Sequence, residues 1–265
     1  MKNPFFSLLN EQQHAGNYPV GTWVMSASPI VAEAVGCAGF DWAVVDMEHT
    51  PLDQMDLVHL LQAIAGTPMV PVTRVPWNDA VMVKRVLDAG VQTLLFPFVQ
   101  DAQEAQRAVA ASKYPPHGVR GMAAMSRGSR FGTVPDYFKQ ANEGVGVIVQ
   151  IETPHAMDRL EEIANVPGVE AIFIGPGDLS GAMGHVGNLM HPEVLAVMAD
   201  AVTRCHQLGK HIGTVGGTPE AVATYRGQGF DFLAVASDLG LLMRNCTSAL
   251  NTIRSQNVKL HSEGY

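Results

Sequence analysis

One repeating pattern restricts the folds open to this chain of 265 residues. A short run of Val, Ile, Leu and Phe ends in polar, Gly or Pro residues, and a segment with helical spacing follows. The runs are continuous rather than alternating, which is typical of parallel strands covered on both faces. We predict strands at 20–25, 41–46, 69–73, 93–97, 146–151, 170–175, 211–215 and 231–236.

Helical segments separate these strands. We predict them at 29–38, 53–65, 78–89, 101–112, 153–164, 191–208, 218–228 and 238–254. Their ends carry the residues that usually begin and end helices. Asn78 and Asp101 are candidate N-caps, and Gly90, Gly209 and Gly229 stand near C-termini.

Eight strands alternating with eight helices, without a Pro- or Ser-rich linker, predict an α/β fold: a closed (β/α)8 TIM barrel. We expect one domain over 1–265, with its core at about 20–254. The rival is a doubly wound open sheet, which a Gly-rich phosphate loop after the first strand would favour. Residues 25–29 have no such loop. A long connection, 113–133, precedes a further helical piece at 135–143 and is a candidate lid or interface.

Charge and cysteine content exclude several functions. The net charge is -8, without a basic run, which argues against a nucleic-acid partner and an anionic membrane surface. Cys37, Cys205 and Cys246 are widely spaced and lack metal-binding spacing, so a reducing compartment is expected. The apolar cluster at 5–9 is too short for a signal sequence, and no apolar stretch is long enough to span a bilayer. We therefore expect a cytoplasmic protein.

Polar residues gather where the predicted strands end. Active sites of TIM barrels lie at the carboxyl ends of the strands, so these residues are the first candidates for a site. They are Asp46, Glu48 and His49 after the second strand, Arg74 after the third, Gln150 and Glu152 after the fifth, and Asp178 after the sixth.

Two carboxylates in this set can share a cation. Glu152 and Asp178 follow neighbouring strands, and Gln150 lies two residues before Glu152, on the same side of its strand. Oxygen ligands without Cys or His favour Mg2+ or Mn2+. Two alternatives stay open: Asp178 could only cap a short helix at 179–183, and Glu152 could pair with an arginine.

A base and an oxyanion partner are also available. His49 follows Asp46 by three residues, and a carboxylate can orient an imidazole as a general base. The alternative is a surface histidine that bonds its own turn. Arg74 offers planar donors to an oxyanion, or else forms a structural pair with Asp46 or Glu48.

Lysine positions disfavour a Schiff-base mechanism, the other common route for aldol chemistry. Every lysine lies at a terminus, within a helical segment, in the long connection or before a strand, and none ends a strand. They are Lys2, Lys84, Lys113, Lys139, Lys210 and Lys259.

Several segments together resemble the HpcH/HpaI family of class II, metal-dependent pyruvate aldolases. The family includes 4-hydroxy-2-oxoheptanedioate aldolase and 2-dehydro-3-deoxyglucarate aldolase, and its fold is a barrel of the phosphoenolpyruvate/pyruvate type. The resemblance runs from about residue 20 to 254. It is carried by Gly39-Phe40-Asp41-Trp42, Asp46-Met47-Glu48-His49, 72–79, Gly118-Val119-Arg120-Gly121, Gln150-Ile151-Glu152-Thr153 and 174–180.

The resemblance implies roles for individual residues. Glu152 and Asp178 match the metal ligands, for Mg2+ or Mn2+ with Co2+ as a substitute. Arg74 matches the arginine that holds the keto oxygen, and His49, supported by Asp46, matches the proton-transfer residue. Substrate-binding positions match Gln150, Gly177, Asp178 and Arg74. Relatives often carry Ala at the position of Gly177, so Gly there enlarges the pocket or loosens a contact with the substrate carboxylate.

The implied activity is reversible aldol cleavage of a 4-hydroxy-2-oxo acid to pyruvate or hydroxypyruvate and an aldehyde, by a homo-hexamer built as a trimer of dimers. The long connection carries three arginines that are expected to contact an acidic aldehyde or another subunit: Arg120, Arg127 and Arg130. Rival functions are a related acyl-CoA lyase or 2-oxo-acid decarboxylase, and a non-catalytic barrel that binds a 2-oxo acid. The chain has no basic cluster for a CoA nucleotide, and its Asp46, His49 and Arg74 argue for catalysis.

Overall fold

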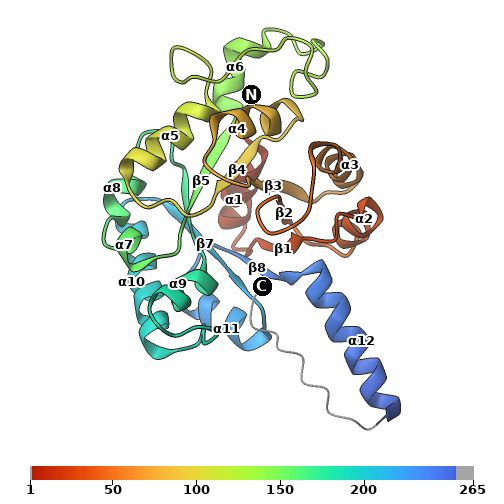
Figure 1. Ribbon diagram of the computed structural model, residues 1–265, viewed down its shortest axis with the longest axis vertical. Helices are drawn as coiled ribbons and strands as arrows, with labels where there is room; N and C mark the ends of the chain where they lie inside the picture. The colour runs from red at the N-terminus through yellow and green to blue at the C-terminus, as the bar shows by residue number, and fades with distance from the viewer. Residues whose placement is uncertain (1, 255–265) are drawn as a thin grey trace.

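A closed barrel of parallel strands organises the molecule (Figure 1). The computed structural model describes residues 2–254. Each strand pairs with the next in the chain, and β8 closes on β1. The strands are β1 Val20–Val24, β2 Trp42–Asp46, β3 Val70–Arg74, β4 Thr93–Phe96, β5 Gly146–Ile151, β6 Ala171–Ile174, β7 His211–Gly216 and β8 Phe232–Ser237. This topology confirms the predicted TIM barrel and excludes the open sheet.

Helices surround the barrel, and the outer part of α12 projects away from it (Figure 1). After α1 they are α2 Pro29–Cys37, α3 Gln54–Ile64, α4 Ala80–Asp88, α5 Ala102–Ser112, α6 Tyr137–Gly144, α7 Pro154–Met157, α8 Leu160–Ala164, α9 Pro176–Ala182, α10 Pro192–Gln207, α11 Pro219–Gln228 and α12 Asp238–Arg254. None of the helices within 2–254 is both long and apolar enough to cross a membrane. Cys37, Cys205 and Cys246 are free thiols.

Helix ends follow the predicted signals with two corrections. Asp101 caps α5 as expected, but Asp79, not Asn78, caps α4. The Asn78 amide instead donates to the carbonyl of Glu104. The helix predicted at 153–164 is two short helices, because Arg159 has non-helical backbone angles between them.

The helix α1, Pro4–His14, is missing from the sequence prediction and lies against the amino-terminal end of the barrel. Phe5 packs edge-on against Trp42 and Phe232, with ring centroids 5.5 and 5.3 Å away. Both partners stand at the first residues of their strands. Only tertiary packing reveals this role, because the apolar cluster of α1 is short.

The barrel interior changes from apolar to polar along the strands. Side chains alternate between the two sides of a strand, so Trp42, Val44 and Asp46 of β2 share the inward side. At the amino-terminal end the interior is filled by large rings. Gly21 makes room for Trp42, since a Cβ there would lie 2.2 Å from the indole. The polar inward residues are thereby left at the carboxyl end.

The long connection lies on the opposite face from the strand carboxyl ends, because it follows α5 and leads through α6 into β5. Arg120 is buried and pairs with Asp88 at 3.0 Å, and Arg127 donates to the carbonyl of Ala89. Arg130 is exposed. Arg120 and Arg127 therefore brace this connection against the end of α4, away from the strand carboxyl ends of the same subunit. The alternative, that these arginines serve a contact with another subunit, stays a prediction.

Candidate active site

Strand register brings the predicted site residues together at the carboxyl end of the barrel. Asp46 is the last residue of β2 and Arg74 is the last of β3, and the register pairs them directly. Gln150 lies in β5, and Glu152 follows it on the same side of the chain. All four of these side chains are buried.

A buried ion-pair network fixes Arg74. Its Nε and Nη2 donate to the two carboxylate oxygens of Asp46 at 2.8 and 2.7 Å, and its Nη1 lies 3.0 Å from Oε2 of Glu48. Asp46 also accepts a hydrogen bond from the Glu48 backbone N–H. We expected Asp46 to support His49. Its oxygens serve Arg74 and Glu48 instead, because parallel pairing places Asp46 opposite Arg74.

His49 stands at the rim of this network. Its side chain is 51% exposed, and its Nε2 lies 3.8 Å from Oε2 of Glu48. The ring is open to solvent and borders the Glu48 carboxylate that pairs with Arg74. Its charged neighbour is therefore Glu48, which the sequence indicated only as a possible ion-pair partner of Arg74.

Glu152 is held from two sides by neutral donors. Its Oε1 accepts from the backbone N–H of Phe98 at 2.8 Å, and its Oε2 accepts from Nε2 of Gln150 at 2.6 Å. Phe98 has a φ of 55°, in the left-handed region that a bulky residue rarely adopts. This conformation aims the N–H at the carboxylate. The alternative that Glu152 pairs with an arginine is therefore not what the structure has.

Burial and neighbouring carboxylates change the protonation of Glu152. Desolvation raises the pKa of Glu152 to about 7; the hydrogen bond from Gln150 opposes this shift, and the charges of Asp178 and Glu48 add to it. The same desolvation raises the pKa of Glu48 to about 7, against the influence of Arg74. Three acidic groups thus repel one another at this face, an arrangement that a cation would relieve.

Asp178 projects from α9 beside this group. Gly175 is the N-cap of α9, so Asp178 lies within its first turn and is not its cap. Asp178 is exposed. The oxygens of Glu48, Glu152 and Asp178 do not all lie within 4.8 Å of one another.

Gly175 makes the Glu152 position available. A Cβ at Gly175 would lie 2.3 Å from Oε2 of Glu152 and 2.9 Å from Nε2 of Gln150. A Cβ at Gly177 would meet nothing within 4 Å. Gly175 was not among the predicted site residues. Its place directly after β6 is the signal that could have identified it.

The residues at this site fit the divalent cation that the sequence predicted. The donor set is carboxylate oxygen, with the amide of Gln150 alongside, and the buried Oε1 of Gln150 has no hydrogen-bond partner among the described residues. Oxygen donors select Mg2+ or Mn2+ over softer ions. Together with the buried Arg74, the site is suited to polarising a bound oxo acid.

Fold and site together define a TIM-barrel enzyme with an acidic, arginine-containing centre at the strand carboxyl ends. Comparison with known proteins gives its family. Residues 20–245 match the profile of the HpcH/HpaI aldolase/citrate lyase family, and the chain belongs to that family. A family structure from Burkholderia cenocepacia superposes with a TM-score of 0.89 at 38% identity, covering 94% of this chain and 99% of the other.

Two relatives with more than 40% identity are named as aldolases. A 2-dehydro-3,6-dideoxy-6-sulfogluconate aldolase of Pseudomonas putida is 52% identical over 238 residues, which is 90% of this chain and 93% of the relative. A 5-keto-4-deoxy-D-glucarate aldolase of Salmonella arizonae is 43% identical, covering 89% of this chain and 92% of the relative. The chain is accordingly a class II aldolase, an aldehyde-lyase.

Proposed function

We propose that this aldolase cleaves and forms 4-hydroxy-2-oxo acids, with pyruvate or hydroxypyruvate and an aldehyde as its partners. Glu152 and Asp178 hold a divalent ion, Mg2+ or Mn2+. The observation that carries the proposal is the fixed guanidinium of Arg74 at the same barrel end as these carboxylates. The positive charges of Arg74 and of the cation then both lie next to the position where an enolate oxygen would develop.

The ion, when bound, supplies Lewis-acid polarisation of the keto carbonyl. The protein's own contribution is orientation. Gln150 and the Phe98 N–H hold the Glu152 carboxylate from both sides, so little reorganisation is needed as charge moves. The backbone around Gly177, at the start of α9, is the surface proposed to receive the substrate carboxylate.

Arg74 is the proposed anchor of the keto oxygen. It is fully buried, and two hydrogen bonds to Asp46 set its plane. A guanidinium fixed before the substrate arrives stabilises negative charge on the oxygen as an enolate forms. Asp46 is then a positioning residue, which acts through Arg74.

His49 is the proposed proton-transfer residue. In the cleavage direction it receives the proton of the C4 hydroxyl as the C3–C4 bond breaks, and C4 leaves as the aldehyde carbonyl. The electron pair of that bond forms the C2=C3 double bond of the enolate, with the negative charge on the keto oxygen. The proton held by His49 then returns to C3 and gives pyruvate. Glu48 lies beside the ring, and its raised pKa lets it exchange protons near neutral pH.

The relatives suggest the substrate class. Both aldolases compared above are named for 2-oxo acid sugars, one with a sulfonate and one with a second carboxylate at the far end. We propose that this chain takes an aldehyde of the same kind, hydroxylated and acidic.

Assembly and location are part of the proposal. Helix α12 exposes Leu239, Leu242, Met243 and Leu250, each more than 40% accessible. An apolar face of this kind on a helix that projects from the barrel supports contact with another subunit. We propose a homo-hexamer, a trimer of dimers, in the cytoplasm.

Solvent exchange of the pyruvate methyl protons tests the mechanism. In D2O we expect the enzyme with Mg2+ or Mn2+ to exchange these protons, EDTA to stop the exchange, and fresh metal to restore it. Circular dichroism before and after chelation controls for unfolding. Exchange that persists after complete chelation would contradict the metal-assisted enolate.

A further inference from the structure

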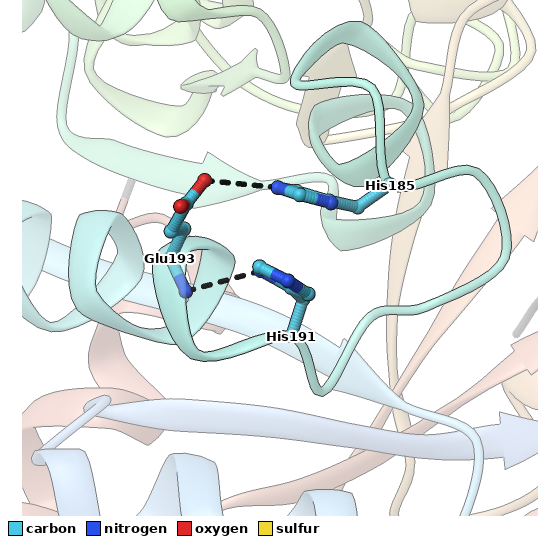
Figure 2. Close-up of side chains that lie close together, drawn as sticks. All are labelled: His185, His191 and Glu193. Atoms are coloured by element: carbon cyan, nitrogen blue, oxygen red, sulfur yellow. Dashed lines mark hydrogen bonds and ion pairs between the residues drawn. The ribbon is translucent and has the colours of Figure 1, made fainter.

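A second group of potential metal ligands lies outside the aldolase site. His185 follows α9, His191 is the N-cap of α10, and Glu193 lies in the first turn of α10 (Figure 2). One ligand atom from each lies within 4.8 Å of the other two. Within residues 2–254 this is the one group of His, Cys, Asp and Glu gathered so closely.

Direct contacts hold the three side chains together. Nε2 of His185 lies 3.0 Å from Oε2 of Glu193. The rings of His185 and His191 stack with centroids 3.5 Å apart and planes 14° apart. Nδ1 of His191 accepts a hydrogen bond from the Glu193 N–H at 3.3 Å. Figure 2 shows the Glu193 side chain turned toward His185.

The connecting segment is ordered by its own backbone. The N–H of His185 donates to the carbonyl of Ser180, and the N–H of His191 donates to the carbonyl of Asn188. The side chain of His185 is 23% exposed and that of Glu193 is 71% exposed. The ligand atoms are therefore held in place and reachable from solvent.

A purely structural role explains only part of this arrangement. The cap of α10 needs His191 alone, and an ion pair needs one histidine with Glu193. Neither role needs two imidazoles face to face, and stacking disfavours a positive charge on both rings at once. Neutral imidazoles beside a carboxylate are the donor set of zinc sites, and a divalent ion balances their charge.

We propose that His185, His191 and Glu193 bind a divalent ion of the borderline class, with Zn2+ as the best match and water completing the shell. Two nitrogens and one oxygen suit Zn2+, Co2+ or Ni2+, whereas the all-oxygen aldolase site suits Mg2+ or Mn2+. Ligands at about 2.0–2.2 Å from Zn2+ stand about 3.3–3.6 Å apart in a tetrahedron. The His185–Glu193 pair is already close to that spacing, and the stacked rings have to splay to share the ion.

Such an ion would cross-link the segment at 183–191 to α10. It would also reach α9, because His185 is bonded to Ser180 of that helix. Asp178 stands on the same helix. The second site is independent of the proposed aldol mechanism, and its place suggests that it stiffens α9 at the rim of the barrel.

Zinc titration tests the proposal. The untagged full chain is saturated with Mg2+ and titrated with ZnCl2 by calorimetry, and CoCl2 absorption reports imidazole ligation. We expect one Zn2+ per chain at this site, and at least tenfold weaker binding in His185→Ala and Glu193→Gln. His191→Asn keeps a good N-cap but removes the ring, so it separates the two roles. We expect it to weaken Zn2+ binding without lowering the melting temperature or the rate of pyruvate proton exchange.

Two controls make the outcome decisive. His206→Ala removes another histidine that lies beside a carboxylate, 3.2 Å from Asp231, and should leave the Zn2+ isotherm unchanged. Glu152→Ala disables the aldolase site and should also leave it unchanged. If His191→Asn titrates like the wild type, or if Glu152→Ala abolishes the Zn2+ signal, the proposal is overturned. Loss of proton exchange in EDTA bears only on the aldol mechanism.

Discussion

Gly175→Ala is the sharpest test of how the fold places Glu152. The new Cβ would lie 2.3 Å from Oε2 of Glu152, about 1 Å inside the 3.4 Å at which ordinary contact begins. The backbone of Gly175 has a φ of -88°, which alanine adopts without strain. The atoms in the way belong to two side chains: Oε2 of Glu152, Nε2 of Gln150 at 2.9 Å and Cβ of Glu152 at 3.1 Å. No backbone atom is among them, so the fold can accommodate the methyl group if these side chains shift. The carboxylate has to move.

We therefore expect Gly175→Ala to lose activity and metal binding, with little change in the free energy of unfolding. A misplacement of about 1 Å costs on the order of 100-fold in rate. Overpacking at one position costs about 1 kcal/mol when the neighbour can yield, which is about 2–4 °C in melting temperature. We expect pyruvate methyl exchange to fall about 100-fold, with Mn2+ binding weakened in parallel.

Gly181→Ala, on the neighbouring helix α9, is the matched control, since its Cβ would meet nothing within 4 Å. Exchange rates in D2O by proton NMR, Mn2+ titration and thermal melts are measured on both variants. Equal exchange rates in the two variants would refute the steric argument. A large loss of melting temperature in Gly175→Ala would show that the site cannot yield locally.

Four further predictions follow from the site and from the exposed face of α12. Arg74→Lys keeps a charge beside Asp46 but loses the planar fork, so exchange should fall about 100-fold with the melt retained, and normal exchange would remove Arg74 from its role. The pKa of Glu152 is raised from 4.5 to about 7, so Mn2+ must displace a proton below pH 7, and its Kd should rise up to about tenfold per pH unit between pH 7 and 5. A Kd that does not change with pH would contradict this. By the same linkage, the protonated carboxyl stabilises the metal-free fold below pH 4.5, and this contribution is lost as pH rises through about 7. Leu242→Asp should reduce the number of subunits seen by light scattering, while Ser248→Asp on the same helix should not, and an unchanged assembly in both would exclude α12 from the interface.

Particular site residues show where sequence reasoning succeeds. Parallel strands share one carboxyl end, so the polar residues at strand ends were enough to predict that Arg74, Gln150 and Glu152 lie at one face. The same reasoning left the partner of Asp46 open between His49 and Arg74. His49 is nearer in sequence, but strand register puts Arg74 opposite Asp46. The raised pKa of Glu48 and the role of Gly175 became visible only through burial and close approach.

The sequence by itself determined the alternation of eight strands and eight helices, because apolar spacing and turn residues act over a few neighbours in the chain. It also determined which strand ends carry charge. Tertiary structure alone decided that α1 closes the barrel, that Arg120 braces a helix, and that His185 meets Glu193. These contacts depend on the path of the loops and on which side chains are buried against one another. Neither can be predicted from the spacing of residues within a short segment.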